Sequence, residues 1–250
     1  MTREPARQEP SRQPAEALAR DERAAAFVAR ETAVACPPFV PEVRLHLATE
    51  VTPLWHATEA ALARAGVPPP YWAFAWAGGQ ALARYLLDHP AVVSGKRVLD
   101  LAAGGGVVAI AAVRAGAAHV SAADIDPFAA AALRLNAALN GVALDVIAED
   151  LTASAAGGAW DVIVAGDVCY ERAMVDRVLP WLRWQARDAA AVLVGDPGRS
   201  YCPAEGVEEI ARYLVPTSLD LEGREQRETR VLRLLPLARS AGVDSPPDGA

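Results

Sequence analysis

Acidic residues follow four separate apolar runs in this 250-residue sequence, namely Asp100, Asp124, Asp150 and Asp167. Short apolar runs that end beside an acid are typical of buried parallel strands. Because ligands of an open parallel sheet bind outside the carboxyl ends of its strands, we expect these carboxylates to surround one crevice. Any single one of them could instead cap the helix that follows it. Four acids around one crevice favour a binding site.

The last of these acids opens a short motif, Asp167-Val-Cys-Tyr170, that joins a carboxylate to an aromatic ring. This pair suits an acceptor that carries an ammonium group on an alkyl stem. The carboxylate can orient and pair with the charged group, and the ring can contact the stem. We therefore predict Asp167 and Tyr170 as the catalytic residues.

The strongest local pattern lies between residues 96 and 116, where an apolar run, three glycines and an alanine-rich segment follow one another. It predicts a strand over 98–101, a glycine turn over 104–106 and a helix over 107–115. Glycines let the backbone approach a ligand, and the helix start presents free N–H groups. Asp124, twenty residues after Gly104, could accept hydrogen bonds from ribose hydroxyls. Together these features predict a nucleotide-binding corner.

The spacing Asp100-x-Ala102-x-Gly104-x-Gly106 resembles motif I of the seven-strand methyltransferases that bind S-adenosylmethionine. A dinucleotide-dependent oxidoreductase is an alternative, although such enzymes usually carry glycine where Ala102 stands. A reductase of that kind also needs a Tyr-x-x-x-Lys pair, and no tyrosine of this chain is followed by lysine four residues later. A non-catalytic binding module with the same fold is a further alternative.

Further positions complete the predicted cofactor site. Asp150 and Leu151 follow the third predicted strand and would flank an adenine base. Trp76 precedes two glycines at a helix start, where a backbone can approach a ligand, and Ala165 ends the fourth predicted strand. The predicted cofactor-binding residues are Trp76, Asp100, Ala102, Gly104, Gly106, Asp124, Asp150, Leu151 and Ala165.

Strand and helix patterns alternate from residue 98 onwards, which is typical of a parallel α/β sheet. We expect a Rossmann-like seven-stranded class I methyltransferase sheet over residues 71–236, mostly parallel with an antiparallel C-terminal strand. Residues 1–22 and 237–250 are expected to be disordered tails, and residues 23–70 a short helical and extended N-terminal extension. The predicted strands are 98–101, 119–126, 144–148, 160–165, 189–194, 217–221 and 229–235, the predicted helices are 24–35, 52–64, 81–88, 107–115, 127–140, 174–184 and 207–214, and 41–48 is predicted to be extended.

Composition restricts the partners. The net charge of −7 and the pI near 5.2 argue against a nucleic-acid partner, because phosphate binding needs a clustered cationic surface. Three cysteines without a CxxC pair and four scattered histidines predict neither a disulfide framework nor a metal site. No apolar run is long enough to cross a bilayer, and the first thirty residues lack a secretory core, so we expect a cytoplasmic protein. The oligomeric state stays open, with a monomer favoured.

Several longer motifs occur together in this chain. They are residues 70–88, Val98-Leu-Asp-Leu-Ala-Ala-Gly104, Asp124-Ile-Asp-Pro127, Gly166-Asp-Val-Cys-Tyr170 and Gly195-Asp-Pro-Gly-Arg199. This set resembles the electron transfer flavoprotein β-subunit lysine methyltransferases, which belong to the seven-strand protein lysine methyltransferases with a D-x-x-Y motif. The chain departs from this family at 102–106, where relatives often carry Gly-Ser-Gly-Cys-Gly and this sequence has Ala-Ala-Gly-Gly-Gly.

The resemblance implies an S-adenosylmethionine-dependent protein-lysine N-methyltransferase whose substrate is the electron transfer flavoprotein β subunit. The implied reaction is an in-line displacement at the cofactor methyl group by a neutral lysine amine that Asp167 aligns. An alternative on the same fold is a methyltransferase of ribosomal-protein or small-molecule amines. The Asn-Pro-Pro-Tyr motif of the ribosomal kind is absent, because this chain lacks both prolines after Asp167.

Overall fold

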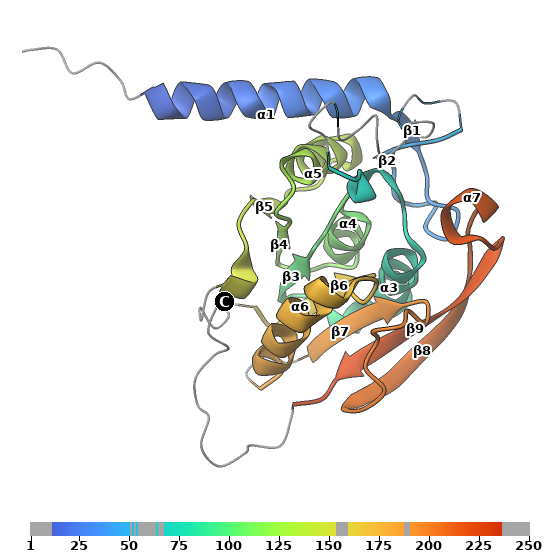
Figure 1. Cartoon of the computed structure of the whole chain (residues 1–250). Coiled ribbons are helices and arrows are strands. Elements are labelled where there is room, and N and C mark those ends of the chain that lie inside the picture. Colours follow the sequence, from blue (N-terminus) through green and yellow to red (C-terminus); the bar gives the residue numbers. More distant parts are fainter. Residues whose placement is uncertain are drawn as a thin grey trace, which may run out of the picture.

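The computed structural model describes residues 12–50, 52, 54, 64, 68–153, 160–187 and 191–236. Its centre is one sheet with the strand order β5-β4-β3-β6-β7-β9-β8 (Figure 1). All neighbours from β5 to β7 pair in parallel, whereas β9 runs antiparallel to both β7 and β8. The expected seven-stranded, mostly parallel sheet is therefore confirmed. The strands are β3 (Arg97–Leu101), β4 (His119–Ala123), β5 (Asp145–Ile147), β6 (Val162–Gly166), β7 (Ala191–Asp196), β8 (Val207–Pro216) and β9 (Gln226–Leu234).

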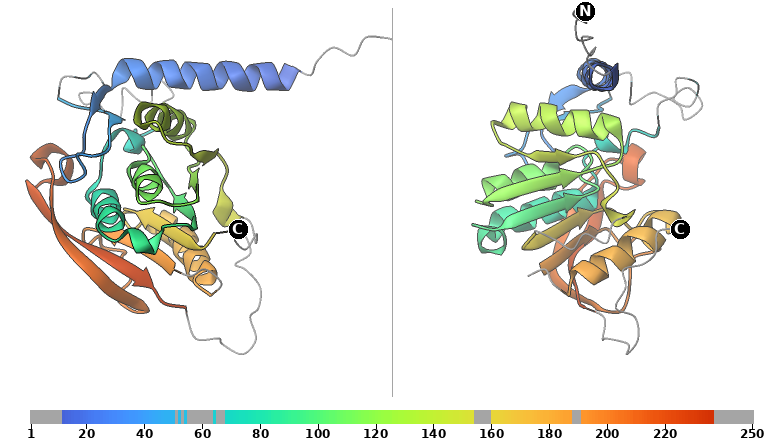
Figure 2. Two further views of the ribbon diagram at one scale, coloured as in Figure 1. Left: turned by 180° about the vertical axis from the view of Figure 1, so that it is seen from behind. Right: turned by 90° about the vertical axis from the view of Figure 1, so that its left-hand side faces the viewer.

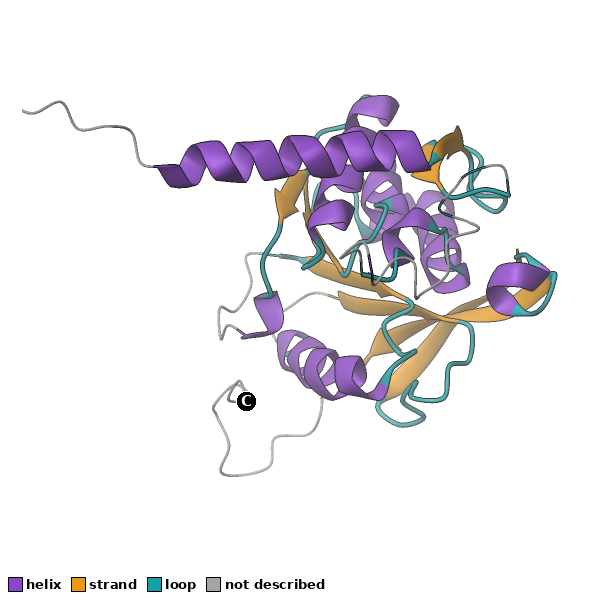
Figure 3. Ribbon diagram, turned by 45° about the horizontal axis from the view of Figure 1, so that its top comes forward, coloured by secondary structure: helices purple, strands orange, loops and turns teal. Residues whose placement is uncertain are grey.

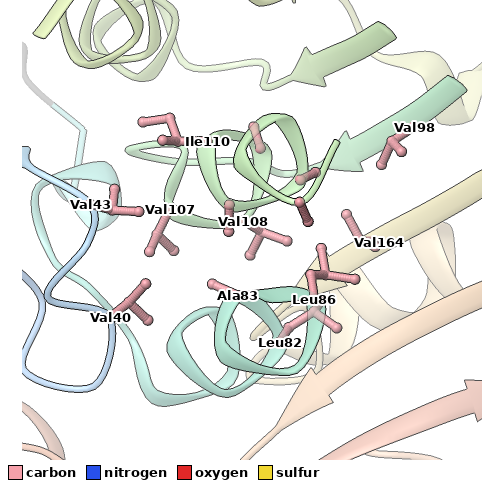
Figure 4. Close-up of a cluster of buried hydrophobic side chains, with 14 of the residues drawn as sticks. Val40, Val43, Leu82, Ala83, Leu86, Val98, Val107, Val108, Ile110 and Val164 are labelled. Atoms are coloured by element: carbon pink, nitrogen blue, oxygen red, sulfur yellow. The ribbon is translucent and has the colours of Figure 1, made fainter. Parts of the chain in front are cut away.

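Helices cover both faces of this sheet because side chains alternate along each strand. Val98, with its equivalents on the neighbouring strands, packs against the helices α3 and α4 (Figure 4). Leu99 points to the opposite face and packs with Trp181 and Leu182 of α6. Figure 3 shows α6 on the other side of the strands from these helices. The main helices are α3 (Ala77–Asp88), α4 (Val107–Arg114), α5 (Pro127–Asn140) and α6 (Arg172–Gln185).

The N-terminal region packs along one end of this core. Helix α1 (Arg12–Glu31) lies across α5, as both views in Figure 2 show. This helix begins at Arg12, inside the segment 1–22 that was predicted as a disordered tail. It ends at Glu31, four residues before the end of the helix predicted over 24–35. Residues 33–35 instead form β1 (Ala33–Ala35), which pairs with β2 (Leu45–Leu47) in a second small sheet. The predicted helix over 52–64 and the tail over 237–250 lie outside the residues that the structure describes, apart from three single positions in the former.

Two predictions near the C-terminus are wrong. The pattern predicts a helix over 207–214, but these residues belong to strand β8. It predicts a strand over 217–221, but this range overlaps the short helix α7 (Leu219–Glu222). The pairing of β8 with β9 shifts register between Glu209 and Ala211, and this bulge interrupts the two-residue alternation. Apolar side chains then recur at 207, 210, 211 and 214, which imitates the period of a helix.

The remaining elements form close to their predicted places. Asp126 caps α5 by accepting the Phe128 N–H at 2.8 Å, and Gly141 ends that helix in the left-handed conformation with φ 64°. Within the described part of the chain, every helix is too short or too polar to cross a membrane.

Candidate active site

A cavity of about 880 Å³ opens at the carboxyl ends of β3, β4 and β6. This is the edge at which an open parallel sheet binds ligands, and the volume lies in the range of small-molecule and cofactor pockets. Eight of the eleven predicted site residues line it: Trp76, Ala102, Gly104, Asp124, Asp150, Leu151, Asp167 and Tyr170. The three that do not line it are Asp100, Gly106 and Ala165.

Asp124 and the glycine turn form one side of the cavity, which we call the cofactor corner (Ala102, Gly104 and Asp124). The Asp124 carboxylate accepts the Gly104 N–H at 2.9 Å and the Asp126 N–H at 3.0 Å. Each carboxylate oxygen keeps a further lone pair for a ligand hydroxyl. Burial raises the pKa of Asp124 above its ordinary value, and backbone hydrogen bonds from Asp126, Gly104 and Ile125 oppose this shift.

The glycine turn combines left-handed backbone conformations with a position that has no room for a side chain. Ala102 and Gly104 have φ values of 55° and 53°, in the left-handed region that a residue with a Cβ rarely adopts. A Cβ on Gly105 would lie 2.8 Å from the carbonyl oxygen of Trp72. The turn is thus pressed against the short helix η1 (Tyr71–Ala73), and Ala102 tolerates a conformation that suits glycine.

The three predicted residues that do not line the cavity, Asp100, Gly106 and Ala165, have structural contacts instead. Asp100 is 1% exposed, and its carboxylate accepts the Ala109 N–H at 2.9 Å in the first turn of α4. Burial raises the pKa of Asp100 to about 8. Gly106 is the N-cap of α4 with φ 85°, and a Cβ there would lie 2.7 Å from Leu133. Ala165 is fully buried in the core beneath α6.

Asp167 and Tyr170 also line the cavity, and we call them the acceptor corner. Asp167 follows β6, which lies on the other side of β3 from β4. Oδ2 of Asp167 accepts the Gly79 N–H at 2.7 Å, so this carboxylate caps the start of α3. Oδ1 is buried without a hydrogen-bond partner among the described residues, and Nη2 of Arg199 lies 3.8 Å from it. Burial raises the pKa of Asp167 to about 7, although the backbone N–H groups and Arg199 favour its charged form.

Gly78 and Gly79 lie in the first turn of α3, where they allow a close approach between segments of the protein itself. A Cβ on Gly78 would lie 2.3 Å from the carbonyl oxygen of Gly195 and 2.7 Å from Oδ2 of Asp167. Gly78 therefore lets α3 approach the backbone of β7, and this approach brings α3 onto the Asp167 carboxylate. Trp76 still lines the cavity, as predicted.

Aromatic rings surround the acceptor corner. Tyr170 is 39% exposed, and its ring centroid lies 5.3 Å from that of Tyr71, which lies 6.3 Å from that of Trp76. The indole Nε1 of Trp76 donates to the carbonyl oxygen of Tyr71 at 2.9 Å. Burial, together with nearby Tyr71, raises the pKa of Tyr170 to about 12, so the phenol is protonated at neutral pH. Trp72, by contrast, is 2% exposed and packs in the core.

Two arginines of the site were not predicted. Arg177 pairs with Asp150 at 3.2 Å, and Asp150 also accepts the N–H and hydroxyl of Thr152. Arg199 pairs with the buried Glu222 at 2.8 Å, which holds its guanidinium beside the acceptor corner. The residues around each arginine in the sequence do not indicate that it lies at the site. Arg199 does, however, belong to one of the motifs that carried the family resemblance.

This arrangement can hold a nucleoside and an amine against each other. The cofactor corner offers a carboxylate for ribose hydroxyls beside a close backbone turn, and the acceptor corner offers a second carboxylate among aromatic rings. Both corners open into the same cavity. A transferred group bound at the first corner would therefore face an acceptor held at the second.

Comparison with known proteins identifies the group to which this chain is related. A family model for ribosomal protein L11 methyltransferases matches residues 80–168. A Xenopus laevis protein named electron transfer flavoprotein beta subunit lysine methyltransferase is 41% identical over 202 residues, which are 80% of this chain and 80% of that protein. Proteins of the same name are 39% identical in Danio rerio, over 73% of this chain and 71% of theirs, and 40% identical in Homo sapiens, over 76% and 71%. The resemblance is thereby confirmed, and the chain belongs to the electron transfer flavoprotein β-subunit lysine methyltransferase family.

Proposed function

We propose that this chain transfers methyl groups from S-adenosylmethionine to lysine side chains of the electron transfer flavoprotein β subunit. The observation that carries the proposal is that Asp124, Asp167 and Tyr170 line one cavity, with Asp124 and Asp167 following the two strands that flank β3. The names of relatives about 40% identical to this chain supply the protein substrate.

The residues present fit the proposed cofactor. Asp124 would accept the ribose hydroxyls, Asp150 and Leu151 would flank the adenine, and the turn at Gly104 would lie against the rest of the molecule. Bound S-adenosylmethionine supplies a methyl group on a sulfonium centre, which a neutral amine can attack. The proposed site needs no metal ligand for this chemistry.

The acceptor corner would have to deliver the lysine as a neutral amine. A free lysine has a pKa of about 10.4 and is almost wholly protonated at pH 7. Asp167 would pair with the incoming ammonium through Oδ1, which has no hydrogen-bond partner among the described residues, while Oδ2 stays bound to α3. Tyr170 and Tyr71 would pack on the alkyl stem of the lysine and exclude water from it. Loss of water disfavours the charged ammonium and so favours the neutral amine. Most of the rate enhancement would come from positioning.

The test uses labelled S-adenosylmethionine with three acceptors in parallel: purified electron transfer flavoprotein, ribosomal protein L11 and free lysine. We expect label on lysines of the flavoprotein β subunit, located by mass spectrometry of its peptides. Asp124→Ala serves as the control with weakened cofactor binding and is assayed at subsaturating cofactor. Label on the other acceptors alone would contradict the proposed substrate.

The ribosomal substrate is included because of the match to the L11 methyltransferase model. That match covers residues 80–168 and ends before Tyr170. It therefore includes the cofactor corner but only part of the acceptor corner. Calorimetric titration with S-adenosylhomocysteine and with NADH distinguishes the methyltransferase from a dinucleotide enzyme, since only the former should bind the homocysteine compound.

A further inference from the structure

Two thiols meet directly behind the acceptor corner. Cys169 precedes Tyr170 in the loop after β6, and Cys202 lies in the loop after β7. Their sulfur atoms and a carboxylate oxygen of Asp196 lie within 4.8 Å of one another. Cys169 is buried, and Cys202 is partly exposed. The third cysteine of the sequence, Cys36, is exposed in the N-terminal region and offers a comparison.

The surroundings give the two thiols different character. Nη2 of Arg230 donates to the sulfur of Cys202 at 3.7 Å, and the β7–β9 register places Arg230 opposite Asp196. Cys202 is partly exposed and is therefore the thiol that an oxidant in solution can reach, and the Arg230 guanidinium lies beside its sulfur. A hydrogen bond with Cys202, burial and the charge of Asp196 all raise the pKa of Cys169, so this thiol keeps its proton.

Asp196 completes the group. Its Oδ1 accepts the N–H groups of Gly198 and Arg199 at 2.7 and 2.8 Å, whereas Oδ2 is buried without a hydrogen-bond partner among the described residues. An unpaired carboxylate oxygen near two thiols can take up a thiol proton. The mechanism proposed for methyl transfer uses none of these three side chains.

We propose that Cys202 and Cys169 are a peroxide-sensitive dithiol that closes to a disulfide beside the active site. The Cys202 thiolate attacks hydrogen peroxide, which breaks the O–O bond, leaves a sulfenic acid on Cys202 and releases hydroxide, which is protonated to water. The sulfur of Cys169 then attacks the Cys202 sulfur, and the hydroxyl group departs as a second water with the Cys169 thiol proton. Two thiols lose two electrons and two protons in total, and peroxide is reduced to two waters.

The disulfide would alter the acceptor corner more than the cofactor corner. An S–S bond is about 2.05 Å long, so the two sulfurs must come closer, through side-chain rotation and movement of the loops that carry them. Cys169 is covalently joined to Tyr170, and the Cys202 N–H donates to the carbonyl oxygen of Arg199 at 3.1 Å. Tyr170 and Arg199 both line the cavity. A misplacement of about 1 Å at either residue can reduce a positioned reaction by about a hundredfold. This consequence rests on the proposed function, whereas the thiol chemistry does not.

A bound metal ion is the competing explanation of the same cluster. Two sulfurs and one carboxylate are ligands that zinc accepts, but a structural zinc site normally has four protein ligands. Here the described residues supply three, and the Arg230 guanidinium lies against one of the sulfurs. A guanidinium at this position disfavours a divalent ion, because the two positive charges repel each other. The dithiol is therefore the better account.

The experiment treats the full-length Cys36→Ser protein with hydrogen peroxide and follows its intact mass. We expect loss of two hydrogen atoms, a peptide that joins residues 169 and 202, and full reversal by dithiothreitol. Cys202→Ser in this background should keep its basal activity and show no such loss. Cys169→Ser should instead stop at one added oxygen on Cys202, which dimedone traps.

Three outcomes would overturn the dithiol. They are oxygen addition at Cys202 without the linked peptide, no change of mass at all, and stoichiometric zinc in the purified protein that Cys202→Ser removes. Binding of S-adenosylhomocysteine and methyl transfer are measured on the same oxidised sample. If no methyl acceptor is ever found, the proposed function fails while the mass experiment still decides the thiol chemistry.

Discussion

Asp167→Asn separates the two roles that the structure gives this residue. The Asn side chain keeps an oxygen that can accept the Gly79 N–H, now at 2.7 Å, so α3 should stay capped. Asn also tolerates the left-handed backbone of this position, where φ is 56°. The amide removes only the negative charge that would pair with the lysine ammonium.

The expected loss of rate follows from that charge. A hydrogen bond to a charged group contributes about 1.5–3 kcal/mol, so methyl transfer should fall roughly tenfold to a hundredfold. Affinity for S-adenosylhomocysteine should stay near wild type, because Asp124 and the glycine turn that it binds are unchanged. The comparison therefore distinguishes an acceptor residue from a cofactor residue.

The same variant should change the dependence of stability on pH. The pKa of Asp167 is raised from 3.8 to about 7 by burial, so the native state binds more protons than the unfolded state between these values. Wild-type stability consequently falls as pH rises through this window. From pH 5 to pH 8 the contribution of this carboxyl amounts to about 2.5 kcal/mol, and the Asn variant should not lose it.

Single-turnover rates at saturating cofactor, and urea unfolding at pH 5, 6, 7 and 8, measure both effects. The wild-type rate should rise as Asp167 ionises near pH 7, and the variant should lack this rise. A folded variant with nearly normal turnover would refute the assignment of Asp167 to the acceptor. A constant difference in stability between pH 5 and pH 8 would refute the account of its burial.

Three further predictions concern the neighbouring residues. Asp124→Ala should weaken S-adenosylhomocysteine binding roughly tenfold to a hundredfold by calorimetry, and an affinity within twofold of wild type would contradict the ribose assignment. Gly78→Ala should lower the free energy of unfolding by about 1–3 kcal/mol, because its Cβ would lie 2.3 Å from the carbonyl oxygen of Gly195. In Gly79→Ala the nearest atom is a Val107 methyl carbon at 3.3 Å, so this variant should lose less than about 1 kcal/mol. Equal losses would argue against the close approach at Gly78. Glu222→Gln should move the rise in rate below pH 7, because the Glu222 charge adds to the burial that raises the pKa of Asp167; an unchanged pH profile would show that the two groups do not interact.

The local patterns of the sequence were sufficient for the central part of the sheet. The run from β3 through the glycine turn to α4 is specified within about twenty residues, because an apolar strand, glycines and an alanine-rich helix each need only their own neighbours. The same is true of α5, which lies at 127–140 as predicted. Strand β8 could not be predicted in this way, since its bulge is defined by pairing with β9 rather than by its own residues.

The sequence by itself determined the strand-end acids, the Asp167–Tyr170 motif and the family to which they point. Only the tertiary structure decided which of these acids line the cavity and which one stabilises a helix instead. Alternation along β3 turns Asp100 to the face of Val98, where it binds α4, whereas Asp124 follows the end of β4 and reaches the cavity. Side-chain direction, and contacts between segments as distant as residues 79 and 167, depend on how the layers pack, and no local pattern records that packing.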